Sequence, residues 1–407
     1  MSLTAHRRLA ALLVLPALLP LCGCGAGADR SRSGEDVAPP FVFRSLDLRQ
    51  QSPLGQLLWE MTSPEARYDL RRQVAQATRP KGTIYRGGKP LYTLQADSGI
   101  VVSDGEAILL EGNLRVERLG SKPVLITADR ARWLPRRKLL LLDRRPQAED
   151  PQGRIVADRA RFLLDQDRLE LSGQPRLERW ELRFALLRGA RRPAAPLQVQ
   201  ANQVSWNPGS GDLRATGPLQ ARRLAPGTPP GQSPQQLSAA ALAGNTISQT
   251  YTLRGPVRYA DTARRERFSG GDVQVQASAN QASTSQPFEA THGDLLISGD
   301  NLSVDGQSHW VSIGSACLLR RPAEMLQAQR CQWNWMSNQV DAAGDVLIER
   351  EINRQRSRAQ QLSGRLGQDG NILLTAPGGR VLSRFRVVAP PPAAAAPPRP
   401  TPPPILP

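Results

Sequence analysis

The sequence predicts an all-β protein, a long and bent antiparallel sheet of repeated units, and two observations carry this prediction. The first is a spacing: five times along the chain, an alanine is followed 16 positions later by a glycine. The second is that apolar and polar side chains alternate around these glycines. Repeats of roughly 20–50 residues are typical of stacked units that bury their apolar faces only against their neighbours. The pairs are Ala96/Gly112, Ala157/Gly173, Ala201/Gly217, Ala239/Gly255 and Ala328/Gly344.

The residues around Gly112 show what one unit is. Ile108, Leu110, Leu114 and Val116 share a face with this glycine, and most residues between them are polar or charged. A period of two predicts a β-strand with one apolar face and one solvated face. The same pattern recurs around Gly173 and Gly255, where the apolar face carries Leu171, Leu177, Leu253 and Val257.

The position of the glycines predicts how the sheet bends. A glycine inside a strand usually marks a bend, a bulge or a close backbone approach. Because these glycines recur in register, they should align into a line along which the sheet folds over. The alternative is that each glycine only relieves local crowding. We favour the fold line, and therefore a bent sheet.

One short helix is expected near the N-terminus, over residues 64–78. Ser63 is a good N-cap, Pro64 suits the first helical position, and the acidic Glu65 follows. The helix should pack against an end of the sheet, because terminal units of repeat proteins need capping. Its apolar face would carry Ala66, Leu70, Val74 and Ala77.

Composition divides the chain into five segments. A basic, proline-containing stretch near 181–196 interrupts the repeats and is the candidate boundary between two repeat blocks. The proline-rich C-terminal segment should be a disordered tail, which is solvated by default and could alternatively engage the cell wall or a partner. The expected segments are a signal peptide (1–23), a tether (24–40), a first repeat block (41–190), a second repeat block (191–388) and the tail (389–407).

The N-terminus predicts export and a lipid anchor. Arg7 and Arg8 precede an apolar run over 9–21, which is short for a membrane span and typical of a signal peptide. The run ends in Leu-Cys-Gly-Cys, which resembles a bacterial lipobox and implies acylation of Cys24. The alternative is ordinary secretion without a lipid. Gly25 follows the cysteine and leaves open which membrane holds the anchor.

The formal net charge of +17 comes from arginines scattered along the chain. A nucleic-acid-binding protein would gather its basic residues on one face with interleaved aromatic side chains. We therefore expect no nucleic-acid partner. The arginines fit either a solvated surface or attraction to anionic lipids.

Apart from Cys24, two cysteines remain in the mature chain, Cys317 and Cys331. An exported compartment is oxidising, and the two cysteines fall on candidate neighbouring strands across a turn at Arg321 and Pro322. We expect a structural disulfide, with two buried free thiols as the alternative. Neither cysteine has a metal-binding spacing.

The sequence offers no catalytic constellation. It contains no HExxH, GxSxG, P-loop or strand-linked GxGxxG motif. Asp129 and Asp158 recur at matching repeat positions, which is typical of turn or bulge residues. We therefore predict no catalytic residue, no metal site and no cofactor, and a protein that is not an enzyme.

Several motifs in the first block resemble the C component of the Lpt-type lipopolysaccharide export system, within the wider OstA-like β-jelly-roll family. The similarity covers about 41–180, and beyond it only the repeat pattern continues. The chain is about twice as long as the short family members, and a lipid anchor replaces their single transmembrane helix. The motifs are Leu57-Leu58-Trp59, Ala66-Arg67-Tyr68-Asp69, Gly82-Thr83-Ile84-Tyr85-Arg86, Pro90-Leu91-Tyr92-Thr93-Leu94-Gln95-Ala96 and Leu110-Glu111-Gly112.

This resemblance implies an open, V-shaped β-jelly-roll whose apolar inner face shields acyl chains. Such a protein takes lipopolysaccharide from the permeases of an inner-membrane ABC transporter and passes it to a homologous bridge protein paired edge to edge. Its place is the periplasmic face of the inner membrane. The alternative is a structural envelope lipoprotein, in which the repeats close into a packed rod without cargo. Under the first reading the groove is lined by Ile108, Leu110, Leu114, Val116, Leu171, Leu177, Leu253 and Val257.

Overall fold

The computed structural model describes residues 41–180, 197–223, 235–351, 354–367 and 370–386, and all of them belong to one unit, Pro40–Pro407. Over these residues the chain forms 34 strands in a single antiparallel sheet, together with three short 3₁₀ turns, η1 (Ser103–Gly105), η2 (Pro135–Arg137) and η3 (Ala277–Ala279). The prediction of an all-β fold is confirmed. Cys24, the signal peptide, the tether, the stretch 181–196 and the tail at 389–407 lie outside the described residues.

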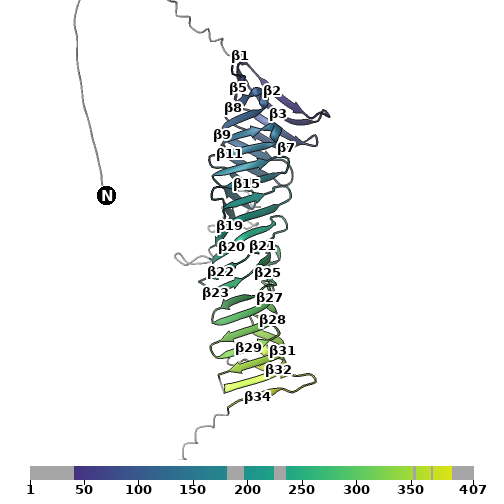
Figure 1. Ribbon diagram of the computed structural model, residues 1–407, viewed down its shortest axis with the longest axis vertical. Helices are drawn as coiled ribbons and strands as arrows, with labels where there is room; N and C mark the ends of the chain where they lie inside the picture. Colours follow the sequence, from purple (N-terminus) through teal and green to yellow (C-terminus); the bar gives the residue numbers. More distant parts are fainter. Residues whose placement is uncertain (1–40, 181–196, 224–234, 352–353, 368–369, 387–407) are drawn as a thin grey trace, which may run out of the picture. The chain divides into compact units, whose positions relative to one another are not determined.

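The sheet is bent into two walls that share their longest strands, and Figure 1 shows the strands following one another in sequence order. Wall A contains β1 (Phe41–Phe43), β4 (Glu65–Asp69), β5 (Val74–Thr78), β8 (Ser98–Val102), β11 (Leu139–Asp143), β14 (Arg159–Leu163), β15 (Arg168–Ser172), β18 (Gln203–Trp206), β21 (Thr250–Arg254), β24 (Val273–Gln276), β25 (Gln281–Thr284), β30 (Arg330–Asn334) and β33 (Ile372–Thr375). Wall B contains β2 (Leu46–Gln51), β3 (Leu57–Ser63), β6 (Lys81–Arg86), β7 (Lys89–Gln95), β12 (Gln147–Asp150), β13 (Gly153–Val156), β16 (Arg176–Arg179), β17 (Leu197–Gln200), β22 (Val257–Asp261), β23 (Glu266–Gly270), β26 (Phe288–His292), β29 (Glu324–Ala328) and β34 (Leu382–Arg384).

Eight long strands run through both walls within the described residues, with one half of each strand in wall A and the other half in wall B. For example, the first half of β9 pairs with β8 in wall A, and its second half pairs with β7 in wall B. We call the line where the walls join the corner, and the opposite side, where each wall turns back in hairpins, the mouth. The shared strands are β9 (Ala107–Arg118), β10 (Val124–Leu134), β19 (Asp212–Arg223), β20 (Gln235–Asn245), β27 (Leu295–Asp305), β28 (Trp310–Arg321), β31 (Gln339–Arg350) and β32 (Gln355–Arg365).

The alanine–glycine spacing has its physical cause at the corner. Gly112 and Gly173 adopt φ values of 77° each, a left-handed conformation that favours glycine. The side chain of the residue after the alanine covers the glycine, so a Cβ atom on Gly112 would lie 2.5 Å from Oδ2 of Asp97. The N–H of Asp97 donates to the carbonyl of Gly112 at 2.9 Å, and the N–H of Asp158 donates to that of Gly173 at 3.2 Å. The recurrent glycines therefore mark the fold line.

The predicted helix over 64–78 is wrong, because these residues form β4 and β5. Leu70, which the helix would have placed on its apolar face, is 59% exposed in the turn between the two strands. Ala66, Ala75 and Ala77 are buried at alternating positions instead. β4 pairs with β1 and β5, and β5 also pairs with β8. These ladders give the backbone the hydrogen bonds that the helix would have supplied, so tertiary pairing overrides the local capping signal.

The hydrophobic core lies between the walls. It forms one large cluster that ends at Val273 and a second that begins at Phe288. Strand pairing continues on both sides of the stretch 181–196, since β15 pairs with β18 and β16 pairs with β17. Among the described residues, no helix is long and apolar enough to cross a membrane.

Candidate lipid-binding interior

The predicted lining residues all belong to the larger cluster between the walls. Those of β9, which are Ile108, Leu110, Leu114 and Val116, are completely buried. Leu171, Leu253 and Val257 are also buried. Leu177 is half-buried, and it alone among the eight lines the cavity between the walls.

This cavity has a volume of about 430 Å³ and lies between walls A and B, lined by residues from Ala148 to Ala277. The volume is within the range of about 300–1,000 Å³ that is usual for small-molecule sites. Wall B contributes side chains from β12, β13, β16 and β17, and wall A contributes side chains from β18 and β21. The apolar lining includes Leu177, Val199, Val204, Leu219 and Leu242.

Five positions in the lining of the cavity carry small side chains. Small side chains fill less of the space between two walls whose separation is set by the backbone. The apolar surface left in contact with water costs about 25 cal/mol per Å², which an apolar ligand would recover on binding. The small residues in the lining are Ala148, Gly153, Ala201, Ala215 and Ala277.

Polar side chains gather at the rim of the cavity. Burial raises the pKa of the Asp150 carboxyl, and the positive charge of Arg179 partly opposes this shift. Burial also raises the pKa of the Tyr251 hydroxyl, again against the influence of Arg179. Arg179 donates a hydrogen bond to the side-chain carbonyl of Gln152. The rim therefore offers charges and hydrogen-bonding groups to the polar end of a ligand whose apolar part lies inside.

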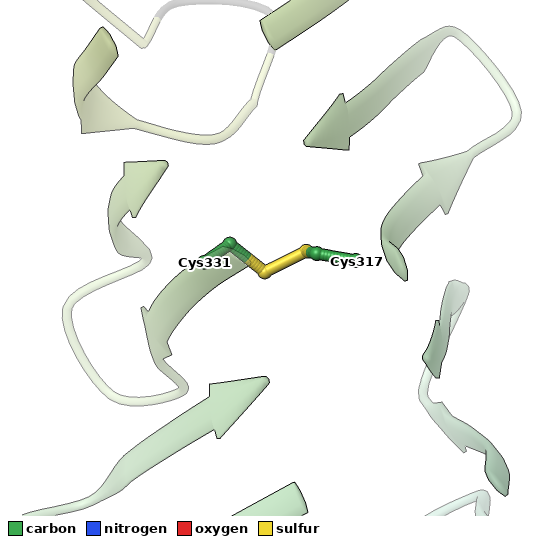
Figure 2. The surroundings of a disulfide bond; sticks show 2 residues. All are labelled: Cys317 and Cys331. Atoms are coloured by element: carbon green, nitrogen blue, oxygen red, sulfur yellow. A yellow bond between two sulfur atoms is a disulfide. The ribbon is translucent and has the colours of Figure 1, made fainter. Parts of the chain in front are cut away.

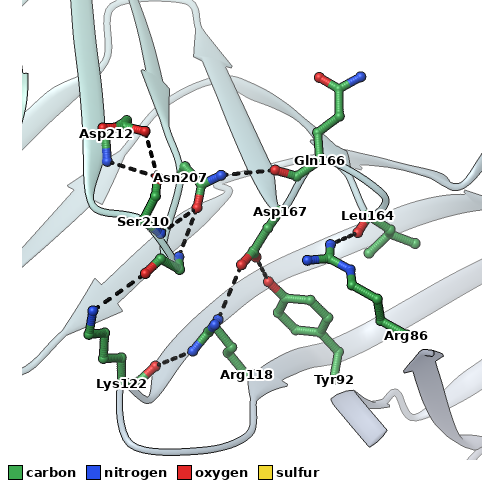
Figure 3. A network of polar contacts seen from close by, with 11 residues as sticks. Arg86, Tyr92, Arg118, Lys122, Leu164, Gln166, Asp167, Asn207, Ser210 and Asp212 are labelled. Atoms are coloured by element: carbon green, nitrogen blue, oxygen red, sulfur yellow. Dashed lines mark hydrogen bonds and ion pairs between the residues drawn. The ribbon is translucent and has the colours of Figure 1, made fainter. Parts of the chain in front are cut away.

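On the N-terminal side of the cavity, polar contacts close the mouth (Figure 3). The Tyr92 hydroxyl, from β7 in wall B, donates to Oδ1 of Asp167, which lies in the turn between β14 and β15 of wall A. Nε of Arg118, at the end of β9 in wall B, lies 3.4 Å from Oδ2 of the same carboxylate. The Asp167 and Arg118 side chains are only 6% and 15% exposed. We call Tyr92, Arg118 and Asp167 the latch.

Further contacts across the mouth surround the latch. Nη2 of Arg86 in β6 donates to the carbonyl of Leu164 at 2.5 Å. Nζ of Lys122, in the turn after β9, donates to the carbonyl of Gly209 at 3.5 Å. Burial raises the pKa of Asp167, and the positive charge of Arg86 acts against this shift. Burial also lowers the pKa of Arg118. The closed mouth thus holds a desolvated ion pair.

The C-terminal part of the interior is closed at both the corner and the mouth. Figure 2 shows the disulfide between Cys317 in β28 and Cys331 in β30, whose Cα atoms are 5.9 Å apart. Cys317 lies in the half of β28 that belongs to wall B, and Cys331 lies in wall A, so the disulfide links the walls. At the mouth, Arg350 pairs with Glu324 at 2.8 Å and donates to the carbonyl of Gly370 at 3.0 Å.

The described residues contain no group of three or more His, Cys, Asp or Glu side chains that could hold a metal ion. Asp129 and Asp158 both lie at the corner, where their N–H groups donate to the carbonyls of Arg144 and Gly173. Asp129 lies at the bulge inside β10, and Asp158 lies between β13 and β14.

Sequence reasoning missed the latch and the rim of the cavity. Tyr92 falls within a motif of the family resemblance, but nothing in the sequence linked it to Asp167, 75 residues away. Small inner residues such as Ala201 and Ala215 do not by themselves indicate the cavity, because Ala131 and Ala160 lie in the packed part of the same cluster.

Two walls of antiparallel strands around an apolar interior define an all-β, jelly-roll-like repeat protein suited to shielding apolar ligands. Residues 13–177 match the family model described as lipopolysaccharide-assembly, LptC-related. Residues 13–177 are therefore LptC-like, and the predicted resemblance, which covers about 41–180, is confirmed. No curated protein matches the chain. The family works in lipopolysaccharide transport, in the periplasm in association with the inner membrane. Most of the cavity lining follows residue 177, beyond the matched stretch.

Proposed function

We propose that this protein is a bridge subunit that receives lipopolysaccharide from the permeases of an inner-membrane ABC transporter and shelters its acyl chains between walls A and B. It then passes the lipid toward the outer membrane through a homologous bridge protein. The single observation that carries this proposal is an apolar cavity between the walls that is open at the mouth, in a chain whose residues 13–177 match the LptC-related family model.

The physical basis is the contrast between the inner face and the rim. Each methylene group that leaves water for an apolar site contributes about 0.8 kcal/mol. An acyl chain would therefore lie between Leu177, Val204 and Leu242. Its polar headgroup would stay at the mouth, where Asp150 and Arg179 are available.

The ends of the sheet support pairing with a homologous protein. Among the described residues, β1 pairs only with β4, and β33 pairs only with β32. Strands with a free edge are templates for strand addition. The side chains of Phe41 and Phe43 in β1 and of Leu373 in β33 are exposed, at 54%, 47% and 65%. A partner strand added there would cover them.

The lipid anchor at Cys24 belongs to the same proposal. It would hold the protein at the periplasmic face of the inner membrane, where the permeases deliver the lipid. Gly25, the residue after the cysteine, is also compatible with an anchor in the outer membrane. Metabolic labelling with a palmitate analogue should label the protein, and Cys24→Ala should abolish the label. An unchanged label in that variant would contradict the anchor.

Site-specific photo-crosslinking tests the cargo. A diazirine amino acid replacing Leu177 should form adducts with lipopolysaccharide in cells, whereas the same group replacing its outward-facing neighbour Arg176 should not. Absence of lipid adducts at Leu177 would favour the alternative, a structural rod without cargo. The closed packing around β9, taken alone, fits that alternative. Co-purification of the permeases with the protein would test the partner.

A further inference from the structure

The latch contacts the turn that follows β18, and the last residue of β18, Trp206, lines the cavity. Gly209, whose carbonyl accepts the hydrogen bond from Lys122, follows the cavity-lining residue Trp206 by three positions in the chain. The space that Cβ of Gly209 would occupy lies within 3.1 Å of both Asp167 and Arg118. The interior is therefore open on one side of this cluster and packed on the other.

The packed side continues the same inner face. Tyr92 pairs with Arg118 across β7 and β9, and the next inward pair on these strands is Leu94 with Val116. Leu114 follows toward the corner. These three apolar side chains are at most 2% exposed and lie directly below the latch. If the walls parted at the latch, the cavity would extend over them.

The walls are held together here by polar contacts at the mouth and by apolar packing below it, where the Tyr92 ring lies 5.1 Å from that of Phe162. The polar contacts are ones that can open reversibly. A buried ion pair adds little net stability, because desolvation offsets most of the attraction. When the mouth opens, Asp167 and Arg118 regain water together, so neither is left as an unpaired buried charge. The walls share β9 and β10 at the corner, and the latch contacts are made by side chains. Parting the mouth therefore breaks no hydrogen bond of the strand ladders.

We propose that Asp167 is a positioning residue that holds the walls together and sets the N-terminal limit of the space open to acyl chains. Release of its contacts to Tyr92 and Arg118 lengthens the cavity into the family-matched stretch, over Leu94, Val116 and Leu114. This inference rests on the proposed function and concerns the regulation of the same site.

The test compares lipid adducts at two inner positions. A diazirine-bearing aliphatic amino acid replaces Leu177, in the cavity, or Leu114, below the latch, and the full chain is incubated with purified lipopolysaccharide and irradiated. The unaltered latch should give adducts at Leu177 and few at Leu114. Asp167→Ala should raise the yield at Leu114 by about tenfold, the shift produced by a change of ~1.4 kcal/mol. Asp167→Asn keeps an oxygen that can accept from the Tyr92 hydroxyl. Its adduct yield at Leu114 should lie between those of the unaltered chain and Asp167→Ala.

The chain offers a matched control in Glu324→Ala, which removes one partner of another buried ion pair at the mouth, in the C-terminal cluster. This variant should leave the yield at Leu114 unchanged, and equal melting temperatures would exclude general loosening as the cause. An equal rise at Leu114 in both variants, or a high yield there with the intact latch, overturns the role of Asp167. If adducts are missing at Leu177 as well, the proposed function itself fails.

Discussion

The stretch around β9 and the stretch around β18 have the same backbone architecture and opposite interiors. In the first, Ile108, Leu110 and Leu114 leave no exposed surface, and the latch closes the mouth. In the second, alanine and valine occupy inner positions such as Ala201 and Val204, and a cavity remains. The comparison teaches that the repeat sets the positions of the walls, whereas side-chain volume and the contacts at the mouth decide whether a groove exists.

The largest expected difference between the two stretches is in the cost of shortening a leucine. Leu114→Ala should lower the free energy of unfolding by about 2–5 kcal/mol, because it leaves a void in a closed core. Leu177→Ala should cost less than about 1.5 kcal/mol, since its side chain is half-buried beside open space. Urea unfolding of both variants measures this, and equal losses would show that the two interiors are packed alike.

The C-terminal cluster extends the comparison, because a covalent link closes it. Replacing both Cys317 and Cys331 with serine should lower the free energy of unfolding by about 3 kcal/mol, the chain-entropy value for a loop of about 15 residues. Hydrogen exchange should accelerate between 288 and 366 and stay unchanged around β9. Reductant should have no effect on the double variant. Uniform acceleration along the chain would contradict a local role for the disulfide.

The corner can be tested with two glycines that differ in their surroundings. Gly112→Ala should cost about 2–3 kcal/mol, because the left-handed backbone is strained and the new Cβ would meet Asp97. Gly87→Ala, in the turn between β6 and β7, should cost about 1 kcal/mol from the backbone alone, since nothing lies within 4 Å of its Cβ position. Thermal unfolding compares them, and a reversed order would contradict the corner geometry.

The smallest effect is expected in the pH dependence of ligand binding at the rim. Burial raises the pKa of Asp150, and an apolar ligand removes more water from its carboxyl group, so binding favours the protonated form. The affinity for an uncharged monoacylglycerol should therefore be highest below this raised pKa. The affinity should fall by less than about tenfold as the pH rises through the pKa of Asp150, which lies above the ordinary pKa of an aspartate. Asp150→Asn should flatten the profile, and a profile unaltered by this variant would assign the titration elsewhere.

Much of the architecture could be predicted from the sequence, because it depends on local patterns. Alternation gave the strands, and the spacing between Ala96 and Gly112 reflects one circuit from corner to corner. The helix over 64–78 was predicted wrongly, because the capping signal of Ser63 is local and the pairing of β4 with β1 is not. Instead of capping a helix, the hydroxyl of Ser63 donates to the carbonyl of Thr78, at the end of β5, at 2.7 Å.

The candidate site was less predictable, for two physical reasons. The cavity exists because the side chains of the two walls together do not fill the space between them. No single residue such as Ala215 or Val199 indicates this alone. The latch joins Tyr92 and Asp167 through a closure of the mouth, and neither side chain falls on a periodic pattern that would bring them together. Both features depend on how two walls face each other, which a pattern along one strand does not contain.

The sharing of long strands between the walls also bears on how the molecule assembles. Each strand pairs with strands that are near it in sequence, such as β9 with β7, β8 and β10. Folding of such an array can start at one end and propagate through nearest neighbours. A polypeptide delivered gradually from its N-terminus can therefore acquire native structure stepwise, before its last segments arrive. The hydrogen bond between Tyr92 and Asp167 joins residues 75 positions apart, so on this route it forms only after the strands between them have folded.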